Sequence, residues 1–182
     1  MKRVIIGFTG PIGAGKSTAA NVLVQQGWRR VRFAGPLKAM AQAFGLSFAQ
    51  VDGDLKETPS ELICRKTPRF FMQRLGTEFG RQMIGDDLWI RAFKHAVGQV
   101  HEDAPIVVDD IRFANEAEAV RSLGGIVVRI DRIGHVGGTG HASEAFDFTP
   151  DFAIANHRRE VFEEEVRAFA MRYREFAERD AA

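Results

Sequence analysis

The segment GPIGAGKS, residues 10–17, decides the fold of this chain. It satisfies the pattern G-x-x-x-x-G-K-[ST], in which glycines let backbone N–H groups close around phosphate oxygens. An apolar run from Val4 to Phe8 precedes the segment, and apolar residues at helical spacing follow it from Lys16 to Gln26. A strand, a glycine-rich loop and a helix in this order predict a phosphate-binding loop, or P-loop, rather than a plain turn.

The side chains of this loop have expected roles in holding a nucleoside triphosphate. The amine of Lys16 is expected to neutralise the β- and γ-phosphates of ATP, and the Ser17 hydroxyl to complete the shell of a Mg²⁺ ion. The N-terminus of the following helix adds a favourable partial positive charge. The expected nucleotide-binding residues of this segment are Gly10, Gly13, Ala14, Gly15, Lys16, Ser17 and Thr18.

Four more segments are predicted to be strands, and the first two of them are expected to be buried. Helices long enough for crossovers separate the strands, so the preferred right-handed connection predicts a parallel five-stranded sheet. Helices then cover both faces of the sheet, which makes this an α/β fold. The four predicted strands are Trp28–Phe33, Ile106–Val108, Ile126–Ile130 and a short Phe152–Ala155.

Helical spacing of apolar residues predicts the remaining elements. A mixed connection is expected at Gly45–Thr58. Asn156 is expected to be the N-cap of a closing helix that ends near Arg179. The other predicted helices are Leu37–Phe44, Thr67–Ile84, Leu88–His101 and Asn115–Leu123.

Charged residues follow two of the predicted strands at their carboxyl ends, where ligands of parallel sheets gather. Asp109 and Asp110 end one strand, and only one of them is expected to orient Mg²⁺, because adjacent strand residues face opposite sides. The alternative is a solvated strand end. Arg129 lies near the end of the next strand and Arg132 follows it, and both are expected to bind the nucleotide near a glycine-rich lid at about 131–144, although surface arginines need no such explanation.

A second group of charges lies on the predicted helix 67–84. Arg74, Glu78 and Arg81 are spaced by four and three residues, so on a helix they share one face. They could bind an anion together, or form an ion-pair ladder at the surface.

Length and composition limit the classes of function. The chain has 182 residues and is predicted to form one domain. A formal net charge of +1 gives no indication of a nucleic-acid or membrane partner. The single cysteine, Cys64, cannot form an internal disulfide, and no apolar run approaches the roughly 20 residues of a bilayer span, which favours the cytoplasm.

Two other sites are not expected. The sequence has no Asn-Lys-x-Asp segment of the kind that reads guanine in GTPases. His135 and His141 flank a glycine loop without a nearby cysteine, so a zinc site is not favoured.

Together these segments resemble the phage-type deoxynucleoside monophosphate kinases, a branch of the P-loop nucleoside monophosphate kinases. The resemblance covers most of the chain and implies a three-layer P-loop kinase fold. Beyond the P-loop, it depends on 33–38 (FAGPLK), 74–81 (RLGTEFGR) with Trp89, 110–117 (DIRFANEA), and 141–144 (HASE) with Asp151 and Asn156.

The resemblance implies transfer of a phosphoryl group from ATP to a deoxynucleoside monophosphate, with Mg²⁺. It implies a helical acceptor-binding insertion at about 36–102, small-molecule nucleotide substrates, and a catalytic set of Lys16, Asp110 and Arg112. Ser17 and Asp110 would hold the metal. The implied substrate-binding residues are Lys38, Arg74, Glu78, Arg81, Trp89 and Arg112.

The chain departs from the family pattern at two positions. An Asp often stands where this chain has Gly35, and a Pro where it has Ala114. A metal or acceptor role for that carboxylate must therefore be absent, or supplied by another group such as Asp109. Apart from the resemblance, Trp89 fits a core residue better than one that stacks on a base, and Arg112 could form a capping salt bridge with Glu116.

Two alternatives of other kinds stay open. A dephospho-coenzyme A kinase has a similar opening to Gly7–Ser17, but its hydroxyl nucleophile requires a carboxylate base that Gly35 does not supply. A non-enzymatic P-loop nucleotide-binding module is the second. The sequence leaves open which base is accepted, whether ribose is tolerated, and whether the chain forms a homodimer.

Overall fold

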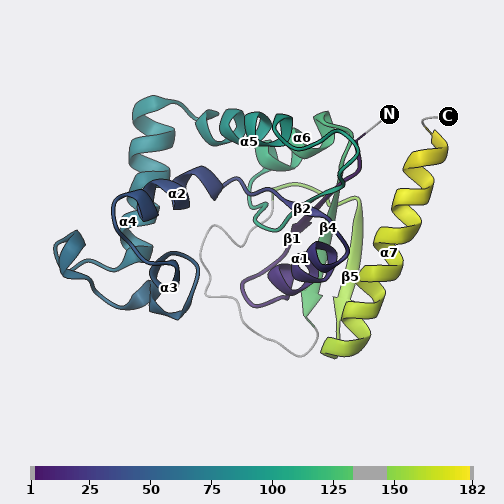
Figure 1. Cartoon of the computed structure of the whole chain (residues 1–182), viewed down its shortest axis with the longest axis horizontal. Coiled ribbons are helices and arrows are strands. Elements are labelled where there is room, and N and C mark those ends of the chain that lie inside the picture. The colour runs from purple at the N-terminus through teal and green to yellow at the C-terminus, as the bar shows by residue number, and fades with distance from the viewer. Residues whose placement is uncertain (1–2, 133–146, 181–182) are drawn as a thin grey trace. The chain divides into compact units, whose positions relative to one another are not determined.

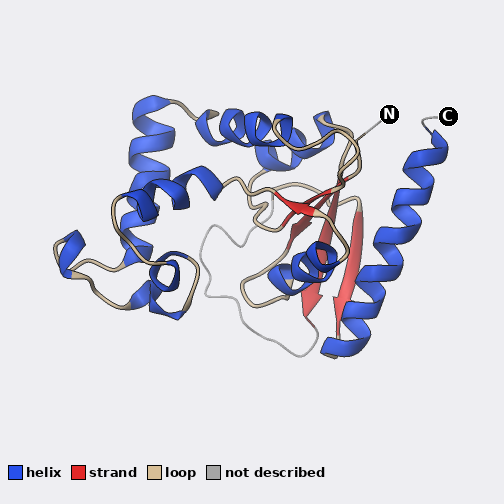
Figure 2. Cartoon of the chain, viewed as in Figure 1, coloured by secondary structure: helices blue, strands red, loops and turns tan. Residues whose placement is uncertain are grey.

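The strand β1 (Ile5–Thr9) lies at the centre of a five-stranded sheet with the order β2-β3-β1-β4-β5. The computed structural model describes residues 3–132 and 147–180. All pairings in the sheet are parallel, as predicted. The other strands are β2 (Arg29–Arg30), β3 (Ile106–Val108), β4 (Ile126–Arg132) and β5 (Phe152–Asn156), drawn in Figures 1 and 2.

The central position of β1 follows from its sequence. All five of its residues are buried, and parallel strands covered on both faces have such continuous apolar runs. Its register pairs Ile5 with Ile106 of β3 and Ile6 with Ile126 of β4. The carboxyl ends of β1, β3 and β4, where the predicted site residues lie, therefore meet at one edge of the sheet.

Three helices cover the two faces of the sheet. They are α1 (Lys16–Gln25), α6 (Ala114–Ser122) and α7 (Arg159–Asp180).

Successive side chains of β1 point to opposite faces of the sheet, so they contact different helices. Ile6 and Phe8 pack in one core with buried residues of α1 and α7. A Cβ atom on Gly7 would lie on the opposite face. There it would meet Val120 of α6 and Ile111, which precedes α6. The sheet is therefore covered on both faces, as predicted.

The chain divides into two compact units. Met1–Arg32 and Ala96–Ala182 form the sheet unit, and Phe33–His95 forms the helical unit. The predicted acceptor-binding insertion, 36–102, coincides largely with the helical unit, while the expectation of a single domain stays a prediction. The elements that begin in the helical unit are α2 (Gly35–Ala43), α3 (Phe48–Val51), η1 (Asp54–Glu57), η2 (Glu61–Ile63), α4 (Pro68–Arg74), η3 (Leu75–Ile84) and α5 (Leu88–Gly98).

The predicted helix 67–84 is confirmed as helical from Pro68 to Ile84, but it is not one continuous α-helix. Thr67 caps α4 through its side chain, α4 ends at Arg74, and the chain continues as a π-helix, η3. The mixed connection 45–58 contains the short helices α3 and η1.

The second predicted strand, 28–33, was too long. Only Arg29 and Arg30 pair with β3, and Arg29 is exposed rather than buried. The strand lies at the edge of the sheet and has one neighbour, so it needs few ladder hydrogen bonds. The apolar residues around it, Trp28, Val31 and Phe33, are buried individually.

The expected N-cap at Asn156 was also wrong. Asn156 is the last residue of β5, and α7 begins only at Arg159. Its side-chain amide donates to the carbonyl oxygen of Ala14, 2.7 Å away, so it supports the P-loop and not the closing helix.

Some expectations fall on residues that the structure does not describe. Most of the predicted lid, together with His135 and His141, lies within 133–146, outside the described residues. Within 3–132 and 147–180, no helix combines the length and the apolar character of a membrane span. The same residues contain no group of three or more His, Cys, Asp or Glu placed to hold a metal ion.

Candidate functional site

Lys16 lies at the start of α1 with its amine turned back onto the loop. Its Nζ donates to the carbonyl oxygens of Gly10 at 2.6 Å and Pro11 at 2.8 Å. The pKa of the Lys16 amine is lowered to about 8, first by burial and then by the nearby positive charge of Arg112, with the Asp109 carboxylate opposing both effects. Lys16 is thus half-buried and not fully exposed, and charged residues that follow β3 change its pKa.

The P-loop backbone requires glycine next to this lysine. Gly15 is the N-cap of α1 with φ of +112°, a left-handed conformation that side chains rarely adopt. A Cβ atom at this position would also come within 2.6 Å of the Asn156 amide nitrogen. Asn156 therefore fixes the loop from β5, by its bond to Ala14 and by its contact with Gly15.

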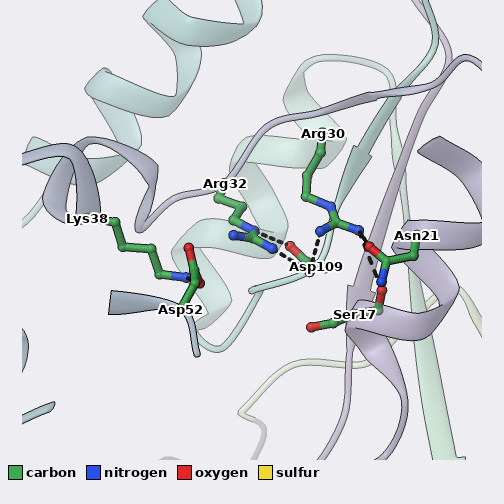
Figure 3. Close-up of polar contacts among 7 residues, drawn as sticks. All are labelled: Ser17, Asn21, Arg30, Arg32, Lys38, Asp52 and Asp109. Atoms are coloured by element: carbon green, nitrogen blue, oxygen red, sulfur yellow. Dashed lines mark hydrogen bonds and ion pairs between the residues drawn. The ribbon is translucent and has the colours of Figure 1, made fainter. Parts of the chain in front are cut away.

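Asp109 at the end of β3 is held by two arginines from and beside β2, as Figure 3 shows. Only 5% of Asp109 is exposed. The Nε of Arg32 donates to Oδ1 of Asp109 at 2.8 Å, and Nη1 of Arg30 lies 3.9 Å from Oδ2.

The same arginine ties this strand end to the P-loop helix. Nη2 of Arg30 donates to Oδ1 of Asn21 at 2.6 Å and lies 3.5 Å from the carbonyl oxygen of Ser17. The carboxylate that affects the pKa of Lys16 is thus part of a network that joins β2, β3 and α1.

Asp110 and Arg112 follow Asp109 in a different setting. Asp110 is partly exposed and Arg112 is exposed, so both reach solvent at the edge where the P-loop lies. The salt bridge considered between Arg112 and Glu116 takes another form: Oε2 of Glu116 accepts from the backbone N–H groups of Arg112 and Phe113, at 2.8 and 3.3 Å. Glu116 therefore caps α6 by bonding to the main chain.

The two arginines of β4 have different contacts. Nε of Arg129 pairs with Asp131 at 2.7 Å. Nη1 of Arg132 donates to the carbonyl oxygen of Gly13 at 3.3 Å, so its guanidinium already lies on the P-loop. The structure brings Arg132 to the nucleotide-binding loop, whereas the guanidinium of Arg129 is paired within its own strand.

In the helical unit, two of the predicted substrate-binding cations form ion pairs with carboxylates. Lys38 pairs with Asp52, also drawn in Figure 3, and Arg74 pairs with Glu78. Arg81 lies in η3 and is partly buried. The ion-pair interpretation therefore holds for Arg74 and Glu78, and a role of these residues in binding substrate stays a prediction.

Trp89 on α5 is a packing residue. Only 6% of it is exposed, and its ring lies against Gly80 of η3. Its indole N–H donates to the carbonyl oxygen of Gly76 at 2.8 Å. A contact between Trp89 and a substrate stays a prediction.

The sheet unit thus collects groups that fit a polyphosphate. Its loop combines glycine backbone with a helix N-terminus, and the Lys16 amine donates to two main-chain carbonyls of the loop, which phosphate oxygens could replace. Carboxylates at the end of β3 and the hydroxyl of Ser17 are oxygen donors of the kind that Mg²⁺ prefers. These residues therefore fit a magnesium nucleotide.

Sequence reasoning missed four members of this site: Asn21, Arg30, Arg32 and Asn156. The signal for Asn156 was present, because it follows a predicted strand. The two arginines lie in the predicted strand 28–33. Its pairing with β3 places Arg32 close to Asp109.

A family model and two relatives of this chain are described as kinases of deoxynucleoside monophosphates. A family model described as deoxynucleotide monophosphate kinase matches residues 64–147. A protein of Acanthamoeba polyphaga mimivirus named "Putative deoxynucleotide monophosphate kinase" is 36% identical over 155 residues, which cover 78% of this chain and 80% of the mimivirus protein. The deoxynucleoside-5′-monophosphate kinase of Escherichia phage T5 is 33% identical over 55 residues, 30% of this chain and 22% of the phage protein.

A solved structure extends the likeness to the fold. The protein TT1252 from Thermus thermophilus aligns over 94% of this chain and 97% of its own, with a TM-score of 0.54 and 17% identity.

Proposed function

The chain belongs to the deoxynucleotide monophosphate kinase family, and on that premise we propose that it transfers the γ-phosphate of ATP to a deoxynucleoside 5′-monophosphate, giving ADP and the diphosphate. The observation that carries this proposal is the P-loop, where Lys16 donates to the carbonyls of Gly10 and Pro11 and lies within electrostatic reach of Asp109 and Arg112. The substrates are small nucleotides.

The donor nucleotide would be held by the P-loop backbone, Lys16 and Thr18, with Arg132 beside Gly13. Ser17 and one carboxylate of β3 would hold Mg²⁺, which neutralises charge on the phosphates. We assign the metal to Asp110. The reason is that Asp110 opens the segment DIRF, residues 110–113, which belongs to the pattern shared with the family.

The acceptor phosphate would be bound by Arg81 and Arg112, with Glu78 orienting Arg81. Support comes from the concentration of charged residues in η3 and α4, and from Lys38 on α2. Guanidinium groups suit phosphate because their planar fork donates two parallel hydrogen bonds.

Positioning, more than acid–base chemistry, is the catalytic task of these residues. The second pKa of a phosphate monoester is about 6, so the acceptor is already largely dianionic at neutral pH. Repulsion between two phosphate groups opposes the reaction, and the cations Lys16 and Arg112 would offset it. Exclusion of water from the site would prevent hydrolysis.

The two alternatives fit the molecule less well. A dephospho-coenzyme A kinase needs a carboxylate near Gly35, where this chain has no side chain. A non-enzymatic module would not explain membership of a kinase family. The chain is expected to act in the cytoplasm, and a homodimer is compatible with the proposal.

A coupled assay of ADP formation tests the proposal. The acceptors are dAMP, dCMP, dGMP and dTMP, their ribonucleotide counterparts, and dephospho-coenzyme A, each with ATP and Mg²⁺. We expect ADP only when a deoxynucleoside monophosphate is present, and a loss of at least a hundredfold in Lys16→Ala with an unchanged unfolding midpoint. ADP formation that needs dephospho-coenzyme A, or that needs no acceptor, would overturn the proposal.

A further inference from the structure

Arg30 of β2 connects the P-loop helix α1 to the carboxylate that follows β3. Its Nη2 donates to Oδ1 of Asn21 at 2.6 Å and lies 3.5 Å from the carbonyl oxygen of Ser17. Its Nη1 lies 3.9 Å from Oδ2 of Asp109. Figure 3 shows the guanidinium between Asn21 and Asp109. One side chain of the edge strand therefore contacts two segments that are far apart in the sequence.

The register of the sheet explains how Arg30 reaches α1. Arg30 lies opposite Val107 of β3, and Val107 packs in the core that contains residues of α1. Side chains at paired positions of neighbouring strands point to the same face of the sheet, so Arg30 faces α1. Ser17 and Asn21 lie one turn apart on the same face of α1, which lets a single guanidinium contact both.

The two segments that Arg30 connects are those proposed to hold Mg²⁺. Ser17 offers its hydroxyl from the first turn of α1, and Asp110 follows Asp109 directly. Mg²⁺ requires near-ideal octahedral geometry with oxygen ligands at about 2.0–2.1 Å. A hydroxyl on a helix and a carboxylate beyond a strand meet this requirement only if the spacing between the two elements is fixed.

The P-loop by itself leaves this spacing open to change. The loop between β1 and α1 contains three glycines, at positions 10, 13 and 15, and glycine has the greatest backbone freedom of any residue. A contact from the sheet to the first turns of α1 limits that freedom where the hydroxyl is needed. Groups that hold metal ligands in place commonly affect metal affinity strongly, although they do not touch the ion.

We propose that Arg30 is a positioning residue for the magnesium site: with Asn21 as its anchor on α1, it fixes the distance between Ser17 and the carboxylates that follow β3. The inference rests on the donor half of the proposed function, which is the binding of a magnesium nucleotide. In this role Arg30 acts through α1 and Asp109, and it contacts neither the metal nor the phosphates.

Two substitutions remove the connection from different ends, and a third is a matched control. Asn21→Ala removes the anchor on α1 and keeps the pair of Arg30 with Asp109. Arg30→Met removes both contacts and keeps a long side chain. Gln25→Ala is the control, because Gln25 is another exposed amide one turn further along the same face of α1.

Calorimetry with a non-hydrolysable ATP analogue, without an acceptor, measures the effect on the metal. Each protein is titrated once in Mg²⁺ and once in EDTA, and the ratio of the two dissociation constants is the factor by which Mg²⁺ tightens nucleotide binding. This factor should fall by about tenfold in Asn21→Ala and in Arg30→Met. The dissociation constant in EDTA should stay within about twofold, and Gln25→Ala should leave both values within the same limit.

The double variant Asn21→Ala/Arg30→Met tests whether the two residues act together. Members of one hydrogen-bond network are not additive, so the double variant should lose no more of the magnesium factor than Arg30→Met alone. Thermal unfolding without ligand shows whether stability explains the result. Asn21 is exposed, so Asn21→Ala should leave the unfolding midpoint nearly unchanged.

Three results would overturn the inference. The first is a wild-type protein whose nucleotide binding Mg²⁺ does not tighten. The second is an unchanged magnesium factor in Asn21→Ala and Arg30→Met, since Arg30 would then only stabilise the fold. The third is an additive loss in the double variant, which would mean that Asn21 does not act through Arg30.

The failure of the proposed function would look different. A wild type that binds the magnesium nucleotide but forms no ADP with any acceptor would contradict the transfer reaction. The calorimetric comparison of Asn21→Ala, Arg30→Met and Gln25→Ala would still decide the role of Arg30, because it uses no acceptor.

Discussion

The two neighbouring carboxylates at the end of β3 differ in their surroundings, and this difference predicts different defects. Asp109→Asn removes a charge that Arg32 and Arg30 surround, so it should lower the free energy of unfolding by about 1.5 to 3 kcal/mol. Asp110→Asn should leave stability nearly unchanged and impair turnover more, with a raised Mg²⁺ requirement. Urea unfolding and a magnesium titration of the rate measure the two effects. Equal or reversed metal effects would assign the metal to Asp109.

The lowered pKa of Lys16 predicts a pH effect on ATP binding. Its value of about 8 means that the free protein loses the amine proton as pH rises through 8. Phosphate oxygens favour the charged amine, so ATP binding at pH 8 should take up a fraction of a proton, and ATP affinity should fall as pH rises from 7 to 9. Calorimetry in two buffers of different ionisation enthalpy, without Mg²⁺, measures the uptake.

Lys16→Arg is the control for this pH effect, because a guanidinium stays protonated throughout the range. Its binding should show no uptake from this position. The same uptake in both proteins would assign the proton to another group.

The two arginines proposed for the acceptor phosphate should differ in kinetics. Arg81→Ala should raise the acceptor KM by about ten- to a hundredfold, the equivalent of about 1.5 to 3 kcal/mol, with ATP affinity unchanged. Arg112→Ala should also reduce turnover, because Arg112 lies within electrostatic reach of Lys16 and its charge opposes repulsion in the transition state. An Arg81→Ala protein with weakened ATP binding and an unchanged acceptor KM would contradict the assignment.

At the level of elements, α7 offers a matched pair for measuring what the core contributes. Phe162 is 1% exposed and packs against residues of α1 and β1, whereas Phe176 on the same helix is 64% exposed. Phe162→Ala should lower the free energy of unfolding by about 3 to 5 kcal/mol. Phe176→Ala should change it by no more than about 0.5 kcal/mol. Equal effects in urea unfolding would mean that α7 does not pack as described.

The elements also show how far the sequence could predict the fold. Continuous apolar runs sufficed for β1 and β3, because strands buried on both faces leave little ambiguity. Spacing alone did not predict the π-helix, whose Gly76 carbonyl accepts a hydrogen bond from Trp89 on another helix. Asn156 was misassigned because a side chain that caps a helix can equally bond to a distant loop.

The candidate site was predictable to a similar extent. The P-loop motif was sufficient to predict Lys16 and its loop, because the chemistry of phosphate binding constrains several neighbouring residues at once. The pairing of Arg30 and Arg32 with Asp109 depends on which strands are neighbours. The order of the strands in the sequence does not show which strands are neighbours in the sheet. The edge strand β2, with two residues, is too short to show an alternating apolar pattern.

At the level of the whole molecule, the order of the strands has a consequence for biosynthesis. The central strand β1 is translated first, but its partners contain Ile106 and Ile126, far later in the chain. A nascent chain therefore carries an unpaired apolar strand while the contiguous segment Phe33–His95 can already make its own contacts. Non-local parallel pairing is slow and leaves such strands open to aggregation. Chaperones that bind apolar segments can therefore bind β1 during the interval before β3 and β4 are synthesised. The strand that leads into the P-loop is synthesised before the strands it pairs with, so it reaches its final surroundings only after they follow.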